Sequence, residues 1–323
     1  MSVFFNDLIQ ITGLTAGSWR TKDLSGAPWN VPTSAIGLVI VAYNSYNMAS
    51  FALRSYGSTD NRINYINVYR KYGCYVGCTN SVFEYYIGST SVQLFLAGYF
   101  EEDAYFFQNA IVQTGNGVVT VPSEVPSSAK AIIVELRGSG TNSWVRSVGV
   151  SPYIQNDYNQ FGIVGLNTSK QYEIFDPAGN TIYVRGYITQ GVWLSSWPDI
   201  SLTVTGSYRD IDLSPYGPTE FSTGALVCVY PTGTYRLYDI RPDGITTERY
   251  SNQYTEKCSY PVRLPANQII EGKIQNLDAD FYLIGFFGSY QPPPITKPTN
   301  EELMRHLRWF HDGKDQGCYL GSR

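Results

Sequence analysis

The sequence FLAGYF (residues 95–100) ends an apolar run with a glycine that is followed by two large side chains. Similar stretches return twice, as VRGYI (residues 184–188) and as LIGFF (residues 283–287). The glycines Gly98, Gly186 and Gly285 are separated by 88 and 99 residues, which is the length of a small β domain and too long for a solenoid repeat. The recurrence predicts one structural unit used three times.

Each glycine follows the same features at a nearly constant distance. A glutamate lies 14, 13 and 14 residues before it, inside a strand–turn–strand pattern typical of a hairpin. An arginine lies 44, 40 and 44 residues before it, and an apolar strand that opens on a small residue lies further upstream. The residues are Glu84, Glu173 and Glu271, then Arg54, Arg146 and Arg241, then Ala35, Ala129 and Ala225. One glutamate and one arginine in each copy favour a structural pair over a catalytic one.

The composition predicts an all-β fold. Aromatic residues make up 15% of the chain, led by 27 tyrosines, and charged residues make up 15%, against about 25% in a typical soluble protein. Short strand patterns separated by Gly, Pro, Asn and Ser indicate three tandem antiparallel, jelly-roll-like β-sandwiches. We expect them at residues 1–108, 109–197 and 198–290. The recurring glycine would mark a β-bulge or a close approach of two backbones.

The carboxyl end, residues 291–323, has a different pattern. The proline-rich stretch YQPPPITKP (residues 290–298) predicts an extended spacer, and the residues after it predict a short amphipathic helix. The apolar face of that helix comprises Leu303, Met304, Leu307 and Phe310. A helix this short is marginal alone, so this face is predicted to bind a partner, with the third sandwich as the alternative docking surface.

The sequence contains no recognised catalytic or metal-binding motif, so we expect no enzymatic activity, no cofactor and no metal. Its only histidines, His306 and His311, lie in the carboxyl tail, where Asp312, Asp315 and Cys318 could complete a metal site only in principle. Carboxylate groups suggest calcium ligands or a glycosidase pair as alternatives, but solvated turns are the simpler interpretation. These groups are Glu101–Asp103, Asp210 with Asp212, and Asp278 with Asp280.

Charge and hydropathy exclude two classes of partner. The net charge of −4, without a basic run, gives no attraction to nucleic acid, and the longest apolar run, residues 35–43, is too short to span a membrane. The amino end does not resemble a signal peptide, and the five cysteines are an odd number, so we expect free thiols and synthesis in a cytoplasm. The cysteines are Cys74, Cys78, Cys228, Cys258 and Cys318.

The stretches LRSYGS (residues 53–58) and IGSTSVQLFLAGYF (residues 87–100), with the threefold tandem layout, resemble the tandem β-sandwich modules of tailed-bacteriophage virion proteins. The resemblance covers about residues 30–290. It implies a non-enzymatic structural role in a capsid decoration, fibre or tail assembly, formed in the host cytoplasm. It also implies a homo-oligomer that contacts other virion proteins, and it carries over no catalytic residue.

Two other functions remain open from the sequence. Aromatic platforms, including Trp144, Trp193 and Trp197, could bind host surface glycans, although sandwich core is the simpler interpretation of these tryptophans. A glycan-cleaving enzyme built on the carboxylates is the third possibility.

Overall fold

The computed structural model describes residues 3–68, 70–137, 143–156, 159–176, 181–218, 222–232, 236–246, 251–253 and 257–288. These residues form antiparallel sheets and one short 3₁₀ helix, Ser214–Tyr216. The expected all-β fold is therefore confirmed. The spacer and the helix expected in residues 290–323, with Leu303, Met304, Leu307 and Phe310, lie outside the described residues.

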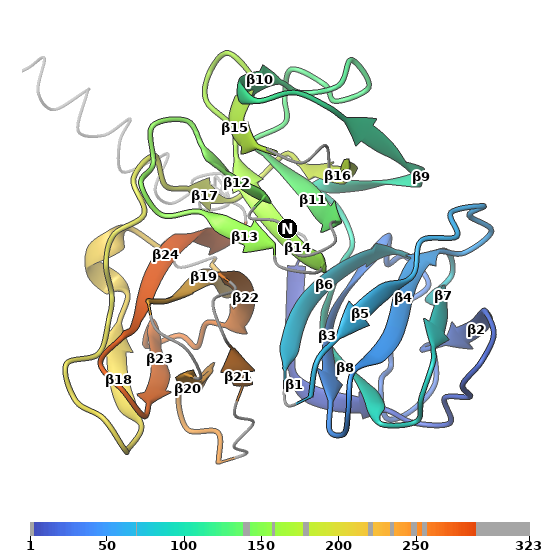
Figure 1. The fold of residues 1–323 in the computed structure, drawn as a ribbon, viewed down its shortest axis with the longest axis horizontal. Helices are drawn as coiled ribbons and strands as arrows, with labels where there is room; N and C mark the ends of the chain where they lie inside the picture. The colour runs from blue at the N-terminus through green and yellow to red at the C-terminus, as the bar shows by residue number, and fades with distance from the viewer. Residues whose placement is uncertain are drawn as a thin grey trace, which may run out of the picture. The chain divides into compact units, whose positions relative to one another are not determined.

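The first eight strands pair into two four-stranded sheets (Figure 1). One sheet has the order β1-β8-β3-β6 and the other has the order β2-β7-β4-β5. The strands are β1 (Val3–Ile11), β2 (Arg20–Asp23), β3 (Gly37–Asn44), β4 (Ala49–Ser55), β5 (Asn64–Ile66), β6 (Lys71–Gly77), β7 (Val82–Ile87) and β8 (Val92–Phe100). We call these strands group one.

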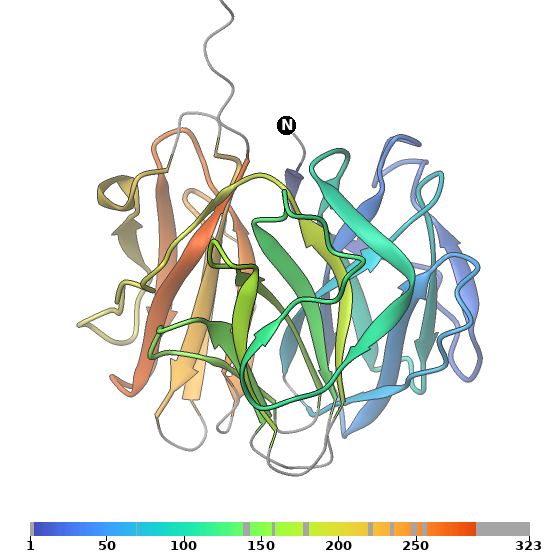
Figure 2. The same cartoon turned by 90° about the horizontal axis from the view of Figure 1, so that it is seen from above.

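The next sixteen strands repeat this order twice, as groups two and three (Figures 1 and 2). The sheets of group two have the orders β9-β16-β11-β14 and β10-β15-β12-β13. Those of group three have the orders β17-β24-β19-β22 and β18-β23-β20-β21. Group two comprises β9 (Ala104–Gln113), β10 (Gly117–Thr120), β11 (Ala131–Arg137), β12 (Ser143–Ser147), β13 (Ile154–Asn156), β14 (Asn159–Gly165), β15 (Gln171–Phe175) and β16 (Thr181–Ile188). Group three comprises β17 (Val192–Trp193), β18 (Arg209–Asp212), β19 (Gly224–Pro231), β20 (Arg236–Pro242), β21 (Ser251–Gln253), β22 (Cys258–Arg263), β23 (Ile269–Ile274) and β24 (Ala279–Phe287).

Burial along the strands follows their place in the sheets. The central strands β3 and β19 are buried at nearly every residue, as expected of strands covered on both faces. The strands β7, β15 and β23 alternate between buried and half-buried side chains, because successive residues point to opposite faces. The half-buried face of these three strands carries the recurring glutamate.

The recurring glycine occupies the same position in all three groups, directly after a one-residue bulge in the eighth strand. The pairs with the third strand are Gly98 with Val39, Gly186 with Ile133 and Gly285 with Leu226. A Cβ on Gly186 would lie 2.0 Å from the Tyr105 carbonyl oxygen, and one on Gly285 would lie 2.4 Å from that of Val192. A bulge and a close approach of the first strand therefore occur together here, which explains why no side chain is tolerated.

The three groups contact one another through equivalent strands. The edge strands β6, β14 and β22 contact each other pairwise (Figure 1). The first strand of each group also packs against another group: β9 against β4 and β6, β17 against β14, and β1 against β19 and β22. The Cβ positions of the equivalent glycines Gly77 and Gly165 lie against Phe106 and Trp193, at 2.8 and 3.0 Å from the Cβ atoms. The contacts therefore close a cycle from group one to two, two to three and three to one.

A buried ion pair of group two makes polar contacts with group one. Arg185, the bulge residue of β16, donates from Nη1 to Glu135 Oε2 at 2.5 Å and from Nη2 to the Leu53 carbonyl oxygen at 2.9 Å. Asn64 donates to Glu135 Oε1 at 3.0 Å, and Arg62 Nη2 lies 3.5 Å from Glu135 Oε2. The Glu135 side chain is 1% exposed. Burial alone would raise the pKa of Glu135, but Arg185 and Arg62 outweigh burial and hold this pKa below its usual value.

Different polar groups join the other two pairs. Between groups one and three, Lys71 Nζ lies 2.8 Å from Asp239 Oδ1, and the Tyr260 hydroxyl donates to the Lys71 carbonyl oxygen at 2.7 Å. Between groups two and three, Lys257 Nζ donates to the side-chain Oε1 of Gln155, and the backbone N–H of Gln155 donates to the Lys257 carbonyl oxygen at 3.0 Å. The three junctions therefore use equivalent strands but different polar side chains.

Candidate functional site

The recurring arginine and glutamate of each group form an ion pair between neighbouring strands. Arg54 is opposite Glu84, Arg146 is opposite Glu173, and Arg241 is opposite Glu271 in the strand registers. The Nε–Oε2 distances are 2.5 Å for Arg146–Glu173 and 2.8 Å for Arg241–Glu271, and Arg54 Nε donates to Glu84 in the same way. The side chains are 14–25% exposed. The nearly constant spacing in the sequence thus reflects one cross-strand contact.

An aromatic ring covers each of these guanidinium groups. The guanidinium carbon lies 4.0 Å from the ring centroid of Trp19 in group one and 3.3 Å from that of Tyr208 in group three. Both rings directly precede the second strand of their group. Asn116 takes this place in group two, where Trp144 of β12 covers Arg146 at 4.7 Å instead. Each arginine is held by a carboxylate and a ring, an arrangement that supports a structural role.

We expect Arg146→Ala to lower stability, because Glu173 and the Trp144 ring hold the guanidinium group in the folded state. The loss should exceed the roughly 1 kcal/mol of an exposed pair and remain below the roughly 3–5 kcal/mol of a fully buried one. Arg20→Ala, at an exposed arginine of β2, is the matched control and should leave the melting temperature unchanged. Unchanged melting of the Arg146 variant together with lost ligand binding would show that the arginine belongs to a binding site.

Five aromatic rings form a continuous strip where groups two and three meet. Trp144 stacks on Phe175 with centroids 5.4 Å apart and on Tyr153 at 5.2 Å. Tyr153 meets Tyr230 edge to face at 5.4 Å, and Tyr230 meets Tyr282 at 5.9 Å. Phe175 is 40% exposed and the other four rings are half-buried. We call these five residues the aromatic strip.

Lys257 contacts the two central rings of the aromatic strip, those of Tyr153 and Tyr230. Its Nζ is 4.7 Å from the ring centroid of Tyr153 and 4.5 Å from that of Tyr230, and it lies 3.3 Å from the Tyr153 hydroxyl. Burial favours a higher pKa for Tyr153, but the hydrogen bond with Tyr230 and the charges of Lys257 and Arg146 together lower this pKa. The pKa of Tyr230 is raised, first by burial and then by Tyr153. The strip therefore combines apolar rings, hydroxyls and positive charge.

The other tryptophans considered as platforms are placed differently. Trp193 is half-buried, packs edge to face on Phe287 and donates from Nε1 to the Gln190 carbonyl oxygen at 3.0 Å. Trp197 is 5% exposed. Only Trp144 therefore contributes to the aromatic strip.

One cluster of three carboxylates lies in group three. Ligand atoms of Asp210, Asp243 and Glu271 lie within 4.8 Å of one another, but Arg241 binds Glu271 and Asn267 donates to Asp243 at 2.6 Å. Two of the three carboxylates therefore have a partner within the chain.

Of the remaining acidic residues, Glu101–Asp103 lie in a loop, Asp212 ends β18 and Asp280 lies in β24. Glu101 accepts a hydrogen bond from Ser34 at 2.7 Å, and the backbone carbonyl of Asp103 accepts one from Thr189. Asp212 accepts one from the Ser214 amide at 2.9 Å, which contributes to a lowered pKa. Burial and the neighbouring charges of Asp199 and Asp278 raise the pKa of Asp280.

The described part of the chain contains no histidine. The cysteines Cys74, Cys78, Cys228 and Cys258 are buried and form no disulfide, and burial raises the pKa of the Cys78 thiol to about 12. His306, His311 and Cys318 lie outside the described residues. None of the helices within the described residues has the length and apolar character needed to cross a lipid bilayer.

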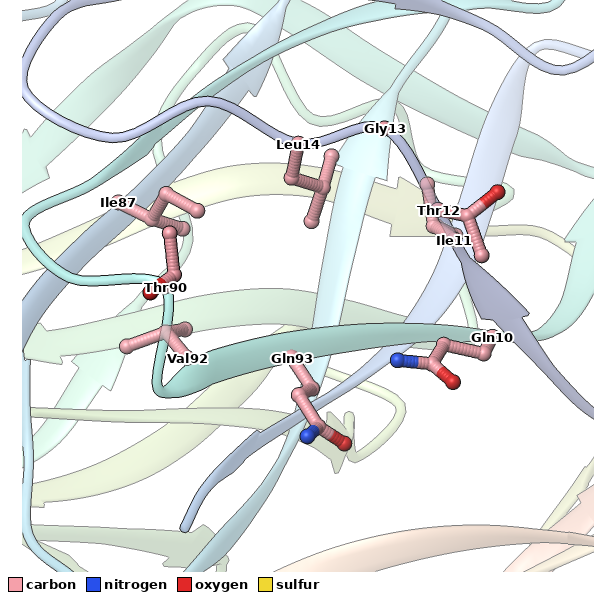
Figure 3. A pocket seen from close by; sticks show the side chains of 9 residues that line it. All are labelled: Gln10, Ile11, Thr12, Gly13, Leu14, Ile87, Thr90, Val92 and Gln93. Carbon is pink, nitrogen blue, oxygen red and sulfur yellow. The ribbon is translucent and has the colours of Figure 1, made fainter. Parts of the chain in front are cut away.

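A pocket of about 240 Å³ lies in group one, where the end of β1 and the loop after it face the loop between β7 and β8 (Figure 3). Its lining residues are Gln10, Ile11, Thr12, Gly13, Leu14, Ile87, Thr90, Val92 and Gln93. No lining residue is charged, so the pocket offers hydrogen bonds and apolar contact.

No family model matches the chain, and no curated protein matches its sequence. One similar solved structure contains the M60 catalytic domain with the CBM51-1 and CBM51-2 domains from Clostridium perfringens ZmpB. It is 8% identical with a TM-score of 0.20, and the match covers 84% of this chain and 33% of that chain. A second is the structure of the entire lipid-containing bacteriophage PM2, 9% identical with a TM-score of 0.16, covering 88% of each chain. Similarity at this level carries no argument about function.

Proposed function

We propose that the chain is a non-enzymatic structural protein of a bacteriophage virion, where it decorates the capsid or forms part of a fibre or tail assembly. In this proposal each strand group is an antiparallel sandwich domain. The observation that carries the proposal is the same eight-strand, two-sheet order in all three groups. Eight strands in two packed sheets are typical of jelly rolls, which occur in viral capsid and lectin domains. Strand pairing supports domain junctions at residues 101–103 and 189–191, near the expected junctions at 108/109 and 197/198.

The chemistry of the described residues favours a scaffold over an enzyme. The recurring charges are paired, the cysteines are buried, and Glu271 of the acidic group in group three is paired with Arg241. A scaffold protein needs stable domains rather than reactive groups. An enzymatic function would have to be argued from the residues of a specific site, because the same fold can serve many functions. The proposal therefore includes no catalytic residue, no cofactor and assembly in the host cytoplasm.

The proposed anchor is the carboxyl tail, because the sequence of residues 299–313 predicts an amphipathic helix whose apolar face needs a groove. Deleting residues 291–323 should leave the melting temperature unchanged and abolish incorporation into the particle or oligomer. Electron microscopy of particles with labelled full-length and truncated chains checks this result. Normal incorporation of the truncated chain would refute the anchor, and absence of the full-length chain from particles would refute the virion role.

The second candidate function is binding of host surface glycans, and the aromatic strip favours it. Half-exposed rings flanked by hydroxyl and charged groups are the usual lining of a site that binds sugars or other small polar molecules. A glycan array probed with the full-length chain tests this function. Binding that disappears in Trp144→Ala and persists in Tyr105→Ala, at a half-exposed tyrosine of β9, would assign it to the strip.

A further inference from the structure

Lys257 is a buried cation whose contacts in the described part of the chain are all neutral. Its residue is 9% exposed, and its Nζ contacts Gln155 Oε1, the Tyr153 hydroxyl and the rings of Tyr153 and Tyr230. Among the described residues, no carboxylate forms an ion pair with it. A buried charge without a counter-charge costs several kcal/mol, because water no longer solvates it.

Lys71 provides an internal comparison. It opens β6 opposite Tyr43, and Lys257 precedes β22 at the equivalent place, next to Cys258, which pairs with Val229. The two residues are similarly buried, at 6% and 9% exposure. Lys71 has a carboxylate partner, Asp239, at 2.8 Å. The same position is thus neutralised in group one and left positive in group three.

The unneutralised lysine lies where a ligand can approach. Tyr153 and Tyr230 are half-buried rather than closed off, and Trp144 and Phe175 continue the apolar surface away from them. The charges of Lys257 and Arg146 also lower the pKa of Tyr153, which indicates positive potential at its hydroxyl. An anion at this point would gain charge-assisted hydrogen bonds, and a sugar ring attached to it would meet aromatic surface.

We propose that Tyr153, Tyr230 and Lys257 form a subsite for the carboxylate of an acidic sugar, and that Trp144 and Phe175 contact its ring. This inference rests on the glycan-binding candidate and specifies its ligand class. Uronic acids and sialic acids share the carboxylate, so both belong in the test.

The test titrates the full-length chain with a glucuronate oligosaccharide, a sialylated oligosaccharide and the neutral glucose counterpart, using calorimetry at fixed salt. We expect at least one acidic ligand to bind about tenfold or more tightly than the neutral one, since a hydrogen bond to a charged group contributes about 1.5–3 kcal/mol. Lys257→Met should remove this preference. Tyr105→Ala, outside the strip, should keep it.

The outcomes distinguish the carboxylate subsite from glycan binding in general. Equal affinity for acidic and neutral sugars, unchanged in Lys257→Met, would overturn the carboxylate subsite and leave glycan binding intact. No binding of any sugar here or on the array would overturn both. Should Lys257→Met fail to fold, Tyr153→Phe removes one hydroxyl donor from the subsite, and an unchanged acidic preference in that variant would also overturn the inference.

Discussion

Glu135→Val is expected to destabilise residues 3–288 by roughly 3–5 kcal/mol, measured by denaturant unfolding. The substitution leaves the Arg185 guanidinium buried between groups one and two with a single strong acceptor, the Leu53 carbonyl oxygen. Arg62 loses the same carboxylate but keeps Asp60 at 2.7 Å. The penalty therefore arises mainly from one unpaired buried charge.

The sequence supplies its own matched control for this experiment. Val41 and Ala97 occupy in group one the positions that Glu135 and Arg185 occupy in group two. The double variant Glu135→Val with Arg185→Ala should recover most of the lost stability, because an apolar pair carries no desolvation penalty. A double variant as unstable as Glu135→Val alone would mean that packing, not charge, determines the effect.

Acid should reveal the same ion pair. The pKa of Glu135 is lowered in the folded state, so the pair contributes its full stability above the unfolded value of about 4.3 and loses it as the pH falls through the folded pKa. Unfolding midpoints measured from pH 6 downward should converge for the wild type and Glu135→Val at the acid end, because both then leave Arg185 without a carboxylate partner. Parallel curves would contradict the assignment.

A circular permutant that starts at residue 102, continues to residue 287, returns through a three-residue linker to residue 3 and ends at residue 101 is expected to fold. The reason is the cycle of contacts, in which β1 packs against β19 and β22 of group three. The other two junctions between groups also use three residues, 101–103 and 189–191. Circular dichroism and thermal melting should match those of the linear chain 3–288 within a few degrees.

The permutant separates a closed cycle from an open array. A three-residue linker reaches about 11 Å, which is too short to join the two ends of three domains in a row. The control permutant carries the same linker but opens between Ile133 and Val134 inside β11, and it should not fold, because a central strand is cut. Failure of both permutants would show that the third junction is not equivalent to the other two.

The sequence allows part of this structure to be predicted because repetition amplifies weak signals. Gly98, Gly186 and Gly285 could be aligned since all three follow the same bulge, and a close backbone approach excludes a side chain at Gly186 and Gly285. The arginines and glutamates could be paired since a hairpin register fixes their separation. Both features depend on residues that are near one another in the fold of a single group.

The rest of the candidate site has no such signal. Tyr153, Tyr230 and Lys257 come from two groups and meet only because β13 and β22 lie at the same junction. Arg185 appears in the sequence as one more residue of an apolar strand, and only the bulge turns it toward Glu135. Contacts between groups depend on how the groups pack together, and the spacing of residues within one repeat does not predict that packing.

The closed cycle has a consequence for stoichiometry. A homotrimer uses one interface three times, so every substitution at that interface occurs in triplicate and every ligand site comes in sets of three. In this chain each junction is encoded once, and the three junctions differ: one has an arginine–glutamate contact, one a lysine–aspartate pair, and one a lysine next to two tyrosine rings. One chain can thus take the place of a homotrimer. Its three junctions between groups differ in chemistry, so a partner can bind one of them selectively.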